Sequence, residues 1–327
     1  MPKSKFCAAI IGCGHIGTSY SNPQSKSGAL THAHAYAHDP RTELVALLDS
    51  KAEIAKKAAK VWGVQAYDDL EEMFNNEKID IVSICVPDEA HQKVLEKCLL
   101  YFPKAVFCEK PMTTSIVAAR KLVGQYARAG IILSINFSRR WNPGVIQLKE
   151  DIQKGKYGQL LNAQGTYTKG ILHNGSHMID LMRYLCGEIT QVRPLSSKAD
   201  WKVSDPSVDA FLQFSNGASA HLCSGDERHF SIFELEMIFT KARVSLKNFG
   251  EDFFYEKVVS DPVYKGYKIL KLAEHKKLDS NKNILYAIAK LVDVLEGKNA
   301  LLSSGGEAYK TQLICHQILN GAMKWKN

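Results

Sequence analysis

The sequence predicts an α/β protein in which a doubly wound parallel sheet comes first and an α+β domain with a large, mainly antiparallel open sheet follows. An apolar run near the N-terminus ends in three closely spaced glycines, and short apolar runs then alternate with helical patterns as far as residue 137. Between residues 208 and 248, by contrast, strand-like runs follow one another without helical patterns between them. Alternation is typical of a parallel sheet, and consecutive strands are typical of an antiparallel one.

Length and composition are those of a globular protein with about two domains. The 327 residues are 45% hydrophobic and 23% charged. Their apolar runs are shorter than the roughly 20 residues that a membrane-spanning helix needs. Residues 1–5 lead directly into the first predicted strand and leave no room for a signal peptide. We therefore expect a cytoplasmic protein without a membrane partner.

Cysteines and charges narrow the functional classes further. The eight cysteines are scattered and none forms a Cys-x-x-Cys pair, so neither a disulfide framework nor a zinc site is expected. The formal net charge is +8, and the basic residues are dispersed. Dispersed positive charge suits an anionic small molecule better than nucleic acid, which usually meets a clustered basic stripe.

The first predicted element is an apolar strand, residues 6–11, that ends in a glycine loop with the spacing Gly-x-Gly-x-x-Gly. Gly12 would permit the tight turn, Gly14 the close approach of backbone to a pyrophosphate, and Gly17 the packing of the next helix. A glycine-rich turn without special function is the alternative. The loop also contains His15 and Ile16.

A polar segment, residues 18–28, separates this loop from the next helix. Its turn-forming residues predict either a flap that closes over a ligand, with Lys26 near an anion, or a solvated insertion. The helix contains His32, His34 and His38, of which only the last two share a face. We do not expect a metal site there.

The second strand, residues 43–49, ends in Asp49. In a dinucleotide fold a carboxylate at this position accepts hydrogen bonds from the ribose hydroxyls of the adenosine and repels a 2′-phosphate. Asp49 lies further from the glycines than the ~20 residues usually found, and the polar segment accounts for the excess. The residue therefore favours NAD over NADP as the cofactor. Lys51 opposes this interpretation, because a cation could pair with a phosphate.

The remaining elements of the first domain alternate in the same way and predict a Rossmann-type doubly wound sheet. We expect Asp88 to cap the helix that contains His91. Since ligands bind at the edge where the carboxyl ends of parallel strands meet, Gly12, Pro87 and Lys110 should lie there with the acid of the second strand. The predicted strands are 64–67, 79–87, 105–109 and 131–137, and the predicted helices are 52–61, one from about 69, and 114–129.

The character of the sequence changes near residues 138–143, where a polar, aromatic connection follows the sixth strand. We predict two domains, residues 1–137 for the dinucleotide and residues 138–327 for substrate binding and oligomerisation. The second domain is expected to contain helices 145–153, 176–186, 283–295 and 307–324, a strand after residue 158, and strands 208–214, 218–224, 232–239 and 242–248.

Lys110 follows a buried strand directly and lies between Glu109 and Pro111. Partial desolvation there would make its ammonium group a donor and an electrostatic anchor for a substrate hydroxyl or keto oxygen. The alternative is a structural pair between Glu109 and Lys110 at the end of the strand.

A second cluster of polar residues lies near the start of a predicted helix. His177, Asp180 and Tyr184 have helical spacing and occupy a face other than the apolar one. A histidine near a helix N-terminus, backed by a carboxylate, suits proton transfer near neutral pH. His173 and His177 also form a His-x-x-x-His pair, but Asn174 replaces the glutamate that zinc hydrolases use. We expect no metal site, and a structural histidine is the alternative.

Together these residues resemble the glucose-fructose oxidoreductase, inositol dehydrogenase and rhizopine catabolism (Gfo/Idh/MocA) family. The resemblance covers essentially the whole chain, and the Glu-Lys-Pro motif with the glycine loop in the correct order is more specific than either alone. It rests on the loop 12–17, Val86-Pro87 with His91, Glu109-Lys110-Pro111, the linker with Arg140, and the Gly-x-x-x-x-Gly-x-His-x-x-Asp stretch that ends in Asp180.

The resemblance implies an NAD(P)-dependent dehydrogenase of sugars, cyclitols or nucleotide sugars, which is dimeric or tetrameric through its open antiparallel sheet. It assigns Lys110 to the substrate and the nicotinamide ribose, and His177 to acid/base catalysis. Many members have an aspartate where this chain has His173, so the chain departs from the inositol dehydrogenase pattern. The segment after Gly17 and the stretches 31–36 and 173–177 are similar to those of members from bacterial surface-polysaccharide and nonulosonic-acid gene clusters. The residues expected at the cofactor are Gly12, Gly14, His15, Ile16, Gly17, Asp49, Val86, Pro87, His91, Glu109 and Lys110.

Our hypothesis is that hydride passes between a substrate carbinol carbon and NAD. His177 takes the hydroxyl proton, Lys110 steadies the oxygen, and Asp180 or His173 orients the histidine. A non-catalytic dinucleotide-bound sensor or regulator is the alternative from another class, and a cofactor-recycling lyase or epimerase is the alternative among enzymes. The candidates for holding the substrate are Arg139, Arg140, Trp141, Lys169, Asn174 and, in the flap, Lys26.

Overall fold

The computed structural model describes residues 5–25 and 28–324, so that Lys26 lies outside the described residues. The chain forms two compact units. One consists of the chain up to Trp141 together with Asn281–Tyr309, and the other of Asn142–Ser280 and the chain from Lys310 onward. The predicted domains are each continuous in sequence. In the structure, the segment Asn281–Tyr309 belongs to the first unit although it lies in sequence between the two parts of the second. The division into domains at residues 137 and 138 stays a prediction.

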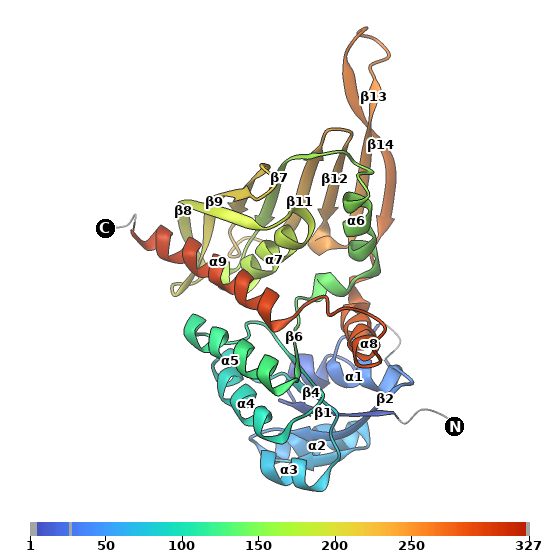
Figure 1. The fold of residues 1–327 in the computed structure, drawn as a ribbon, viewed down its shortest axis with the longest axis vertical. Coiled ribbons are helices and arrows are strands. Elements are labelled where there is room, and N and C mark those ends of the chain that lie inside the picture. Colours follow the sequence, from blue (N-terminus) through green and yellow to red (C-terminus); the bar gives the residue numbers. More distant parts are fainter. Residues whose placement is uncertain (1–4, 26–27, 325–327) are drawn as a thin grey trace. The chain divides into compact units, whose positions relative to one another are not determined.

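The first unit contains a six-stranded sheet in the order β3-β2-β1-β4-β5-β6 (Figure 1). All of its strand pairs are parallel. This order places the strands that follow β1 in sequence on both sides of it, so the predicted doubly wound parallel sheet is confirmed. The strands are β1 (Phe6–Ile11), β2 (Thr42–Leu48), β3 (Gln65–Tyr67), β4 (Ile81–Ile84), β5 (Ala105–Cys108) and β6 (Ile132–Ile135).

Alternate residues of β1 explain how helices cover this sheet. Ala9 and Ile11 belong to a core that includes residues of α3, α4 and α5, whereas Ala8 and Ile10 belong to a core that includes residues of α1, α2 and α8. Successive side chains of a strand point to opposite faces, so helices lie on both faces of the sheet. The helices are α1 (His32–His38), α2 (Ala52–Trp62), α3 (Leu70–Asn76), α4 (His91–Cys98), α5 (Ile116–Ala129) and α8 (Asn283–Leu295).

Local signals in the sequence set most ends of these helices. Asp69 and Ser115 accept hydrogen bonds from the third backbone amide after them, and Gly130 ends α5 in the left-handed conformation. The predicted cap by Asp88 is wrong. A 3-10 turn, Asp88–Ala90, lies between β4 and α4, so Asp88 belongs to that turn and Ala90 takes the capping position without a side-chain hydrogen bond.

The polar segment after the glycine loop is anchored at both ends. Thr18 donates a hydrogen bond to the carbonyl of Cys13 (2.8 Å), and the hydroxyls of Ser21 and Thr31 lie 2.8 Å apart. Gly28 has a φ of +102°, and a Cβ there would lie 2.9 Å from the carbonyl oxygen of Asn281. Gly28 therefore packs against the start of 281–309, and Thr18 is bound to the glycine loop.

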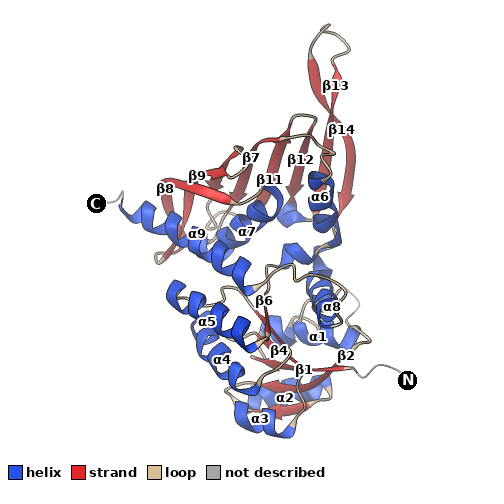
Figure 2. Ribbon diagram, viewed as in Figure 1, coloured by secondary structure: helices blue, strands red, loops and turns tan. Residues whose placement is uncertain are grey.

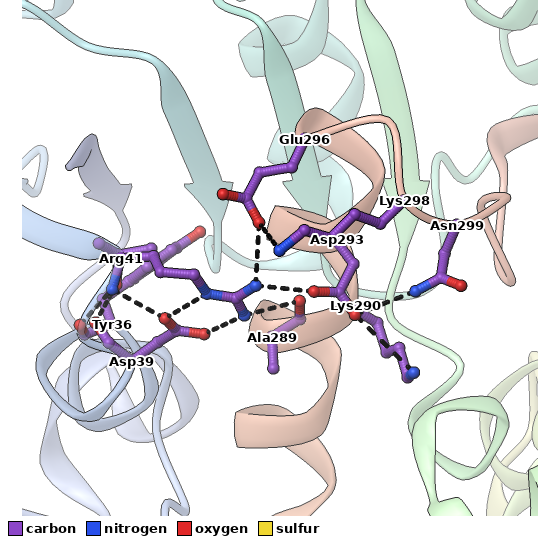
Figure 3. Close-up of polar contacts among 10 residues, drawn as sticks. Tyr36, Asp39, Arg41, Ala289, Lys290, Asp293, Glu296, Lys298 and Asn299 are labelled. Carbon is purple, nitrogen blue, oxygen red and sulfur yellow. Dashed lines mark hydrogen bonds and ion pairs between the residues drawn. The ribbon is translucent and has the colours of Figure 1, made fainter. Parts of the chain in front are cut away.

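An ion-pair network ties α8 to the turn between α1 and β2 (Figure 3). The guanidinium of Arg41 pairs with Asp39 at 2.7 Å, with Asp293 at 2.7 Å and with Glu296 at 3.3 Å. It also donates a hydrogen bond to the carbonyl of Ala289 (3.1 Å). One side chain thus joins residues that are far apart in sequence within the first unit.

Replacing Arg41 by alanine should lower the free energy of unfolding by about 2 kcal/mol, because the largely buried carboxylate of Asp39 loses a charged partner. Although burial raises the pKa of Asp39, its hydrogen bonds with Arg41 hold that pKa below the ordinary value. This part of the stability is therefore present near neutral pH and lost as the pH falls through the acidic range. Urea unfolding at several pH values measures both effects.

The matched control is Lys56→Ala, which breaks an exposed pair with Glu53 at 3.6 Å. Exposed pairs contribute little, so this variant should lose at most about 0.5 kcal/mol. Equal losses in the two variants would contradict a special role for Arg41.

The second unit contains an eight-stranded sheet in the order β14-β13-β12-β11-β7-β10-β9-β8 (Figure 2). Its pairs are antiparallel except for the parallel pair of β7 and β10, so the predicted mainly antiparallel sheet is confirmed. Phe233, Leu235, Met237 and Phe239 alternate along β11 and join a core with residues of α6, α7 and α9. The predicted strands are β7 (Leu160–Tyr167), β9 (Asp205–Phe214), β10 (Ser219–Ser224), β11 (Phe233–Phe239) and β12 (Ala242–Lys247), and the helices are α6 (Pro143–Gln153), α7 (Gly175–Cys186) and α9 (Gly305–Lys324).

Three strands of this sheet were not predicted: β8 (Ile189–Lys202), β13 (Asp252–Ser260) and β14 (Lys268–Lys277). They include both edges of the sheet, and nine of the ten residues of β14 are exposed. An edge strand with so little buried surface has no alternating apolar pattern. Within this unit, β13 and β14 form a hairpin that extends beyond the other strands (Figure 1).

In the part of the chain that the structure describes, no helix has the length and apolar character needed to span a membrane.

Candidate functional site

The three glycines of the first loop differ in what the surrounding chain requires of them. A Cβ on Gly12 would lie 2.6 Å from the backbone of Cys85, and a Cβ on Gly17 would lie 2.2 Å from the carbonyl oxygen of Gly12. Both glycines are therefore needed for the packing of the loop itself. Gly14 is exposed, and a Cβ there would meet nothing within 4 Å. The open side of the loop leaves its backbone accessible to a ligand.

Asp49 directly follows β2, and its carboxylate is hydrogen-bonded to the glycine loop. One oxygen accepts from the backbone amide of Cys13 and the other from that of Lys51, each at 3.0 Å. The carboxylate is thus fixed beside the loop at the carboxyl end of the sheet. An acid in this place, next to an open glycine backbone, fits the adenosine ribose and pyrophosphate of a dinucleotide. Burial raises the pKa of the Cys13 thiol to about 12, so this group stays neutral.

His15 and Ile16 lie in a short π-helical turn, His15–Ser19, that follows the second glycine. The rings of His15 and Tyr20 are exposed and stacked, with their centroids 4.8 Å apart and their planes at 14°. Ile16 is half-buried. Their contact with a cofactor stays a prediction.

Substitution of Gly14 tests the open side of the loop. We expect Gly14→Val to weaken NADH binding on the order of tenfold, about 1.4 kcal/mol, without a change in Tm, because the new side chain projects into space that the chain leaves empty. Gly17→Val should instead lower Tm, since its side chain would collide with backbone. Protein fluorescence during titration with NADH measures the affinity.

The control for this pair is Gly124→Ala in the middle of α5, which should leave NADH affinity unchanged. Unchanged affinity in Gly14→Val would show that the open side of the loop does not receive the dinucleotide.

The loops that follow β4 and β5 meet through His91. Its ring is buried, with Nε2 at 2.9 Å from the carbonyl oxygen of Val86 and Nδ1 at 2.5 Å from that of Pro111. Both carbonyls can only accept hydrogen bonds. His91 therefore links the segment that contains Pro87 to the segment that contains Lys110, and its predicted contact with the cofactor stays a prediction.

Glu109 is held by two side chains that sequence patterns did not assign to the site. One of its oxygens accepts hydrogen bonds from Nε2 of His32 (2.9 Å) and from the amide of Asn136 (2.7 Å). Burial raises the pKa of Glu109, but these hydrogen bonds and the charge of Lys110 hold it below its ordinary value. The carboxylate is therefore ionised at neutral pH. Lys110 follows it at the end of β5, joined to Pro111 by a cis peptide bond.

The substrate candidates of the first unit lie in the short turn after β6. Arg140 is buried, donates a hydrogen bond to the carbonyl of Leu302 (3.1 Å) and pairs with Glu307 at 3.8 Å. Trp141 is fully buried, with its ring edge-on to that of a phenylalanine in β5. Burial lowers the pKa of the neighbouring Arg139 to about 10, which leaves it charged at neutral pH. The assignment of these three residues to the substrate stays a prediction.

In the second unit, carboxylates and a hydroxyl hold the turn that precedes α7. The backbone amide of Lys169 donates to Asp200 at 2.9 Å, and that of Gly170 donates to Ser207 at 2.9 Å. Both oxygens of Asp205 accept from the turn, from the amides of Leu172 (2.8 Å) and His173 (3.0 Å). Asp200 was missed because β8 was not predicted, and Asp205 and Ser207 were missed because β9 begins three residues before the predicted strand 208–214. The turn, Gly170–Asn174, includes Asn174 and leads directly into α7.

His177 and Asp180 lie in the first turns of α7. His177 is half-buried, whereas Asp180 is buried and accepts a hydrogen bond from the hydroxyl of Thr311 at 3.1 Å. The ring of His173 lies 4.6 Å from that of Trp201, over which the ammonium of Lys169 lies at 5.5 Å. The sequence patterns also did not predict that Trp201 lies beside His173 and Lys169. Orientation of His177 by Asp180 or His173 stays a prediction.

The described residues, 5–25 and 28–324, contain no cluster of metal ligands. Within these ranges, no three or more histidine, cysteine, aspartate or glutamate side chains are grouped so that they could hold a metal ion.

Two family models match the chain. Residues 6–137 match the oxidoreductase family with an NAD-binding Rossmann fold, Gfo/Idh/MocA, and residues 168–245 match a Gfo/Idh/MocA C-terminal domain. The two matches cover the predicted site residues except Arg139, Arg140 and Trp141, which lie between the matched ranges. The cofactor class predicted from Asp49 and the glycine loop is thus the one that the first model describes.

Named relatives agree with this family. The chain is 24% identical to D-apiose dehydrogenase of Paraburkholderia graminis over 226 residues, which is 64% of this chain and 57% of the relative. It therefore covers little more than half the length of that protein. Among solved structures, levoglucosan dehydrogenase with NADH and levoglucosan has a TM-score of 0.82 at 17% identity, covering 98% of both chains. The WlbA dehydrogenase of Bordetella pertussis with NADH and UDP-GlcNAcA has a TM-score of 0.78 at 18% identity, covering 99% of this chain and 97% of that one. At such identities these likenesses concern the fold.

Proposed function

Because the chain belongs to the Gfo/Idh/MocA family of oxidoreductases, we propose that it is an NAD-dependent dehydrogenase. It would transfer a hydride between the nicotinamide cofactor and a hydroxyl or keto carbon of a sugar, cyclitol or nucleotide sugar. The observation that supports this most strongly is the position of Lys110 at the edge of the sheet that also presents the open glycine loop and Asp49. The names of the sugar dehydrogenases to which the chain is similar point the same way.

The first unit would hold the dinucleotide. The backbone at Gly14 is accessible for the pyrophosphate, and Asp49 supplies an acceptor for the ribose hydroxyls. When bound, NAD supplies the acceptor for the hydride. Lys110 offers a positive charge and N–H donors to the substrate oxygen, and it stabilises the negative charge that develops there.

His177 is the proposed acid/base residue. A carbinol that gives its hydroxyl proton to His177 and its C–H hydrogen as a hydride becomes a carbonyl, and the reverse steps reduce the carbonyl again. A half-buried imidazole at the start of a helix can exchange its proton with solvent after each turnover. Asp180 or His173 is proposed to orient the ring.

An anionic substrate is part of the proposal. Lys169 and Lys202 place ammonium groups 5.5 and 4.3 Å from the ring centre of Trp201, and Asn174 lies in the turn that follows Lys169. The relative from Bordetella pertussis was solved with a nucleotide sugar, UDP-GlcNAcA. Arg139, Arg140 and Trp141 are further candidates from the first unit. Equal activity on a charged sugar and on its neutral counterpart would contradict this part of the proposal.

The experiment that tests the proposal is a substrate screen with the purified protein. NAD and a panel of sugars, cyclitols, uronic acids and nucleotide sugars are supplied, and reduced nicotinamide is followed by its absorbance. The proposal predicts net formation of NADH with at least one member of the panel. Tight NADH binding without turnover on any member would favour the non-catalytic sensor. Conversion of a sugar without net NADH would favour the recycling lyase or epimerase.

Two further properties are proposed with the function. We expect a homodimer or homotetramer, because the hairpin of β13 and β14 exposes large apolar side chains, among them Val263, Tyr264 and Tyr267. Light scattering after size exclusion measures the oligomeric state, and a monomer would contradict the proposal.

A cytoplasmic location is proposed from the eight cysteines, all of which are unpaired thiols.

A further inference from the structure

A continuous series of hydrogen bonds, buried at Tyr36 and part-buried at Glu109, runs beneath the carboxyl edge of the parallel sheet. The hydroxyls of Tyr36 and Ser83 lie 2.8 Å apart, and Nδ1 of His32 lies 2.8 Å from the same Ser83 hydroxyl. Nε2 of His32 lies 2.9 Å from Glu109, which also accepts from Asn136. Tyr36, His32 and Ser83 have no exposed surface. The series thus joins α1, β4 and the ends of β5 and β6 to the residue that precedes Lys110.

The protons in this series have a defined direction. An ionised carboxylate can only accept hydrogen bonds, so the proton between Glu109 and His32 belongs to Nε2. In the neutral imidazole, Nδ1 is then the acceptor and Ser83 donates to it. Burial raises the pKa of Tyr36, which therefore remains a phenol and donates to Ser83. Every link from Tyr36 to Glu109 is satisfied in this arrangement.

The arrangement contains a glutamate, a histidine and a serine in hydrogen-bonded order, but it is not built for nucleophilic attack. Ser83 lies inside the apolar strand β4 and is fully buried. Of the five residues in the series, only Glu109 has a substantially exposed side chain, at 17%. The series of hydrogen bonds therefore begins in the core at Tyr36 and ends at the edge of the sheet at Glu109. This arrangement suits the positioning of Glu109.

We propose that His32 is a positioning residue for the Glu109-Lys110-Pro111 loop. His32 and Asn136 fix the carboxylate of Glu109, and His91 holds the carbonyl of Pro111. Lys110 thus lies between two residues that buried side chains hold in place. The consequence for catalysis rests on the proposed role of Lys110 in the reaction, whereas the consequence for the mobility of the loop does not.

Two amide variants of His32 distinguish the hydrogen bond made by Nε2 from the one made by Nδ1. In His32→Gln the side-chain amide takes the place of Nε2 and can still donate to Glu109. In His32→Asn the shorter side chain can meet Ser83 but not Glu109. Both variants replace an aromatic ring that lies 5.0 Å from Phe107, so both lose similar packing. A purely structural role would affect the two variants alike.

The matched control is His34→Asn. His34 belongs to the same helix and is equally buried, but its ring lies against His38 and Trp62. The substitution removes a buried imidazole from α1 without altering the series of hydrogen bonds that leads to Glu109.

Hydrogen exchange measured by mass spectrometry gives a readout that does not need activity. We expect His32→Asn to speed exchange in the peptide that covers residues 108–112 by tenfold or more relative to His32→Gln, while His34→Asn leaves it unchanged. In the substrate assay, kcat should fall by tenfold or more in His32→Asn, remain within about threefold of wild type in His32→Gln, and change more than KM, because small displacements of a catalytic group are costly.

Equal exchange in His32→Asn and His32→Gln would overturn the proposal. Faster exchange in His32→Asn with equal kcat values would support the positioning role and reject the proposed role of Lys110 in the reaction. Faster exchange in His32→Asn together with a wild-type protein that oxidises no sugar would support the positioning role and reject the proposed function. If His32→Asn does not fold, the 15N chemical shifts of the wild-type imidazole decide the question. A proton on Nε2 supports the proposed hydrogen bond, and a neutral ring with its proton on Nδ1 overturns it.

Discussion

Replacing Lys110 by methionine should lower kcat by about 100-fold or more, because the substrate oxygen loses its positive partner in the transition state. The two side chains have similar length, so packing changes little. Lys110→Arg should recover only part of the activity, since the planar guanidinium directs its charge differently from an ammonium group. NADH binding should stay within a few-fold of wild type, because Asp49 and the glycine loop are unchanged. Steady-state kinetics and NADH titration of the same preparations measure these effects.

Lys97→Met is the matched control for this prediction. Lys97 is an exposed lysine in the last turn of α4, and its replacement should leave kcat unchanged. Full activity in Lys110→Met would contradict the proposed role and would favour a structural lysine at the end of β5.

Replacing His177 by alanine should lower kcat by about 100-fold or more, since the hydroxyl proton loses its acceptor. Added imidazole should restore part of the activity, because a small base can enter the space left by the side chain. His221→Ala, which removes an exposed histidine from β10, should keep full activity. The initial rate of NADH formation, measured with and without imidazole, checks the prediction.

A wild-type rate in His177→Ala would contradict the assignment of the acid/base role. A reduced rate that imidazole does not restore, together with a lower Tm, would indicate that His177 supports the fold of α7.

Local patterns in the sequence were sufficient to predict the first sheet and the position of Asp49 at the same edge as the glycine loop. The glycine loop and the acid after the second strand depend on neighbouring residues, and the structure places Asp49 within hydrogen-bonding distance of that loop. Alternation of strands and helices was likewise sufficient for a parallel sheet, and consecutive strands for an antiparallel one. These features are determined by short stretches of chain, and short stretches are what a single sequence shows directly.

Other parts of the site depend on contacts between residues far apart in sequence. His32 attracted attention as a possible metal ligand, yet its ring contacts Ser83 and Glu109, which lie 51 and 77 residues away. Ser83 interrupts an apolar strand, and a buried hydroxyl in such a strand is a signal that a polar partner lies opposite. Asp205 supports the turn before α7 across 32 and 33 residues. No periodicity could have revealed these partners.

Two features of the fold were missed for a similar reason: strand β14, and the packing of residues 281–309 with the first unit. Strand β14 is exposed along most of its length, so burial imposes no pattern on its residues. The helix at 283–295 was predicted with the correct range, but its packing with the first unit depends on Arg41 and on apolar contacts such as those of Ile288 with the core beneath α1. A helical period shows which face is apolar and does not show which sheet that face covers.

The most direct test of the proposed hydride transfer uses a substrate found in the screen, labelled with deuterium at the carbon that is oxidised. After reaction with unlabelled NAD, mass spectrometry of the reduced nucleotide measures whether the label has moved. We expect NADH that contains one deuterium for each molecule of ketone or aldehyde formed. Product that forms without deuterium in the nucleotide pool, or a nucleotide that remains bound and oxidised, would contradict direct hydride transfer.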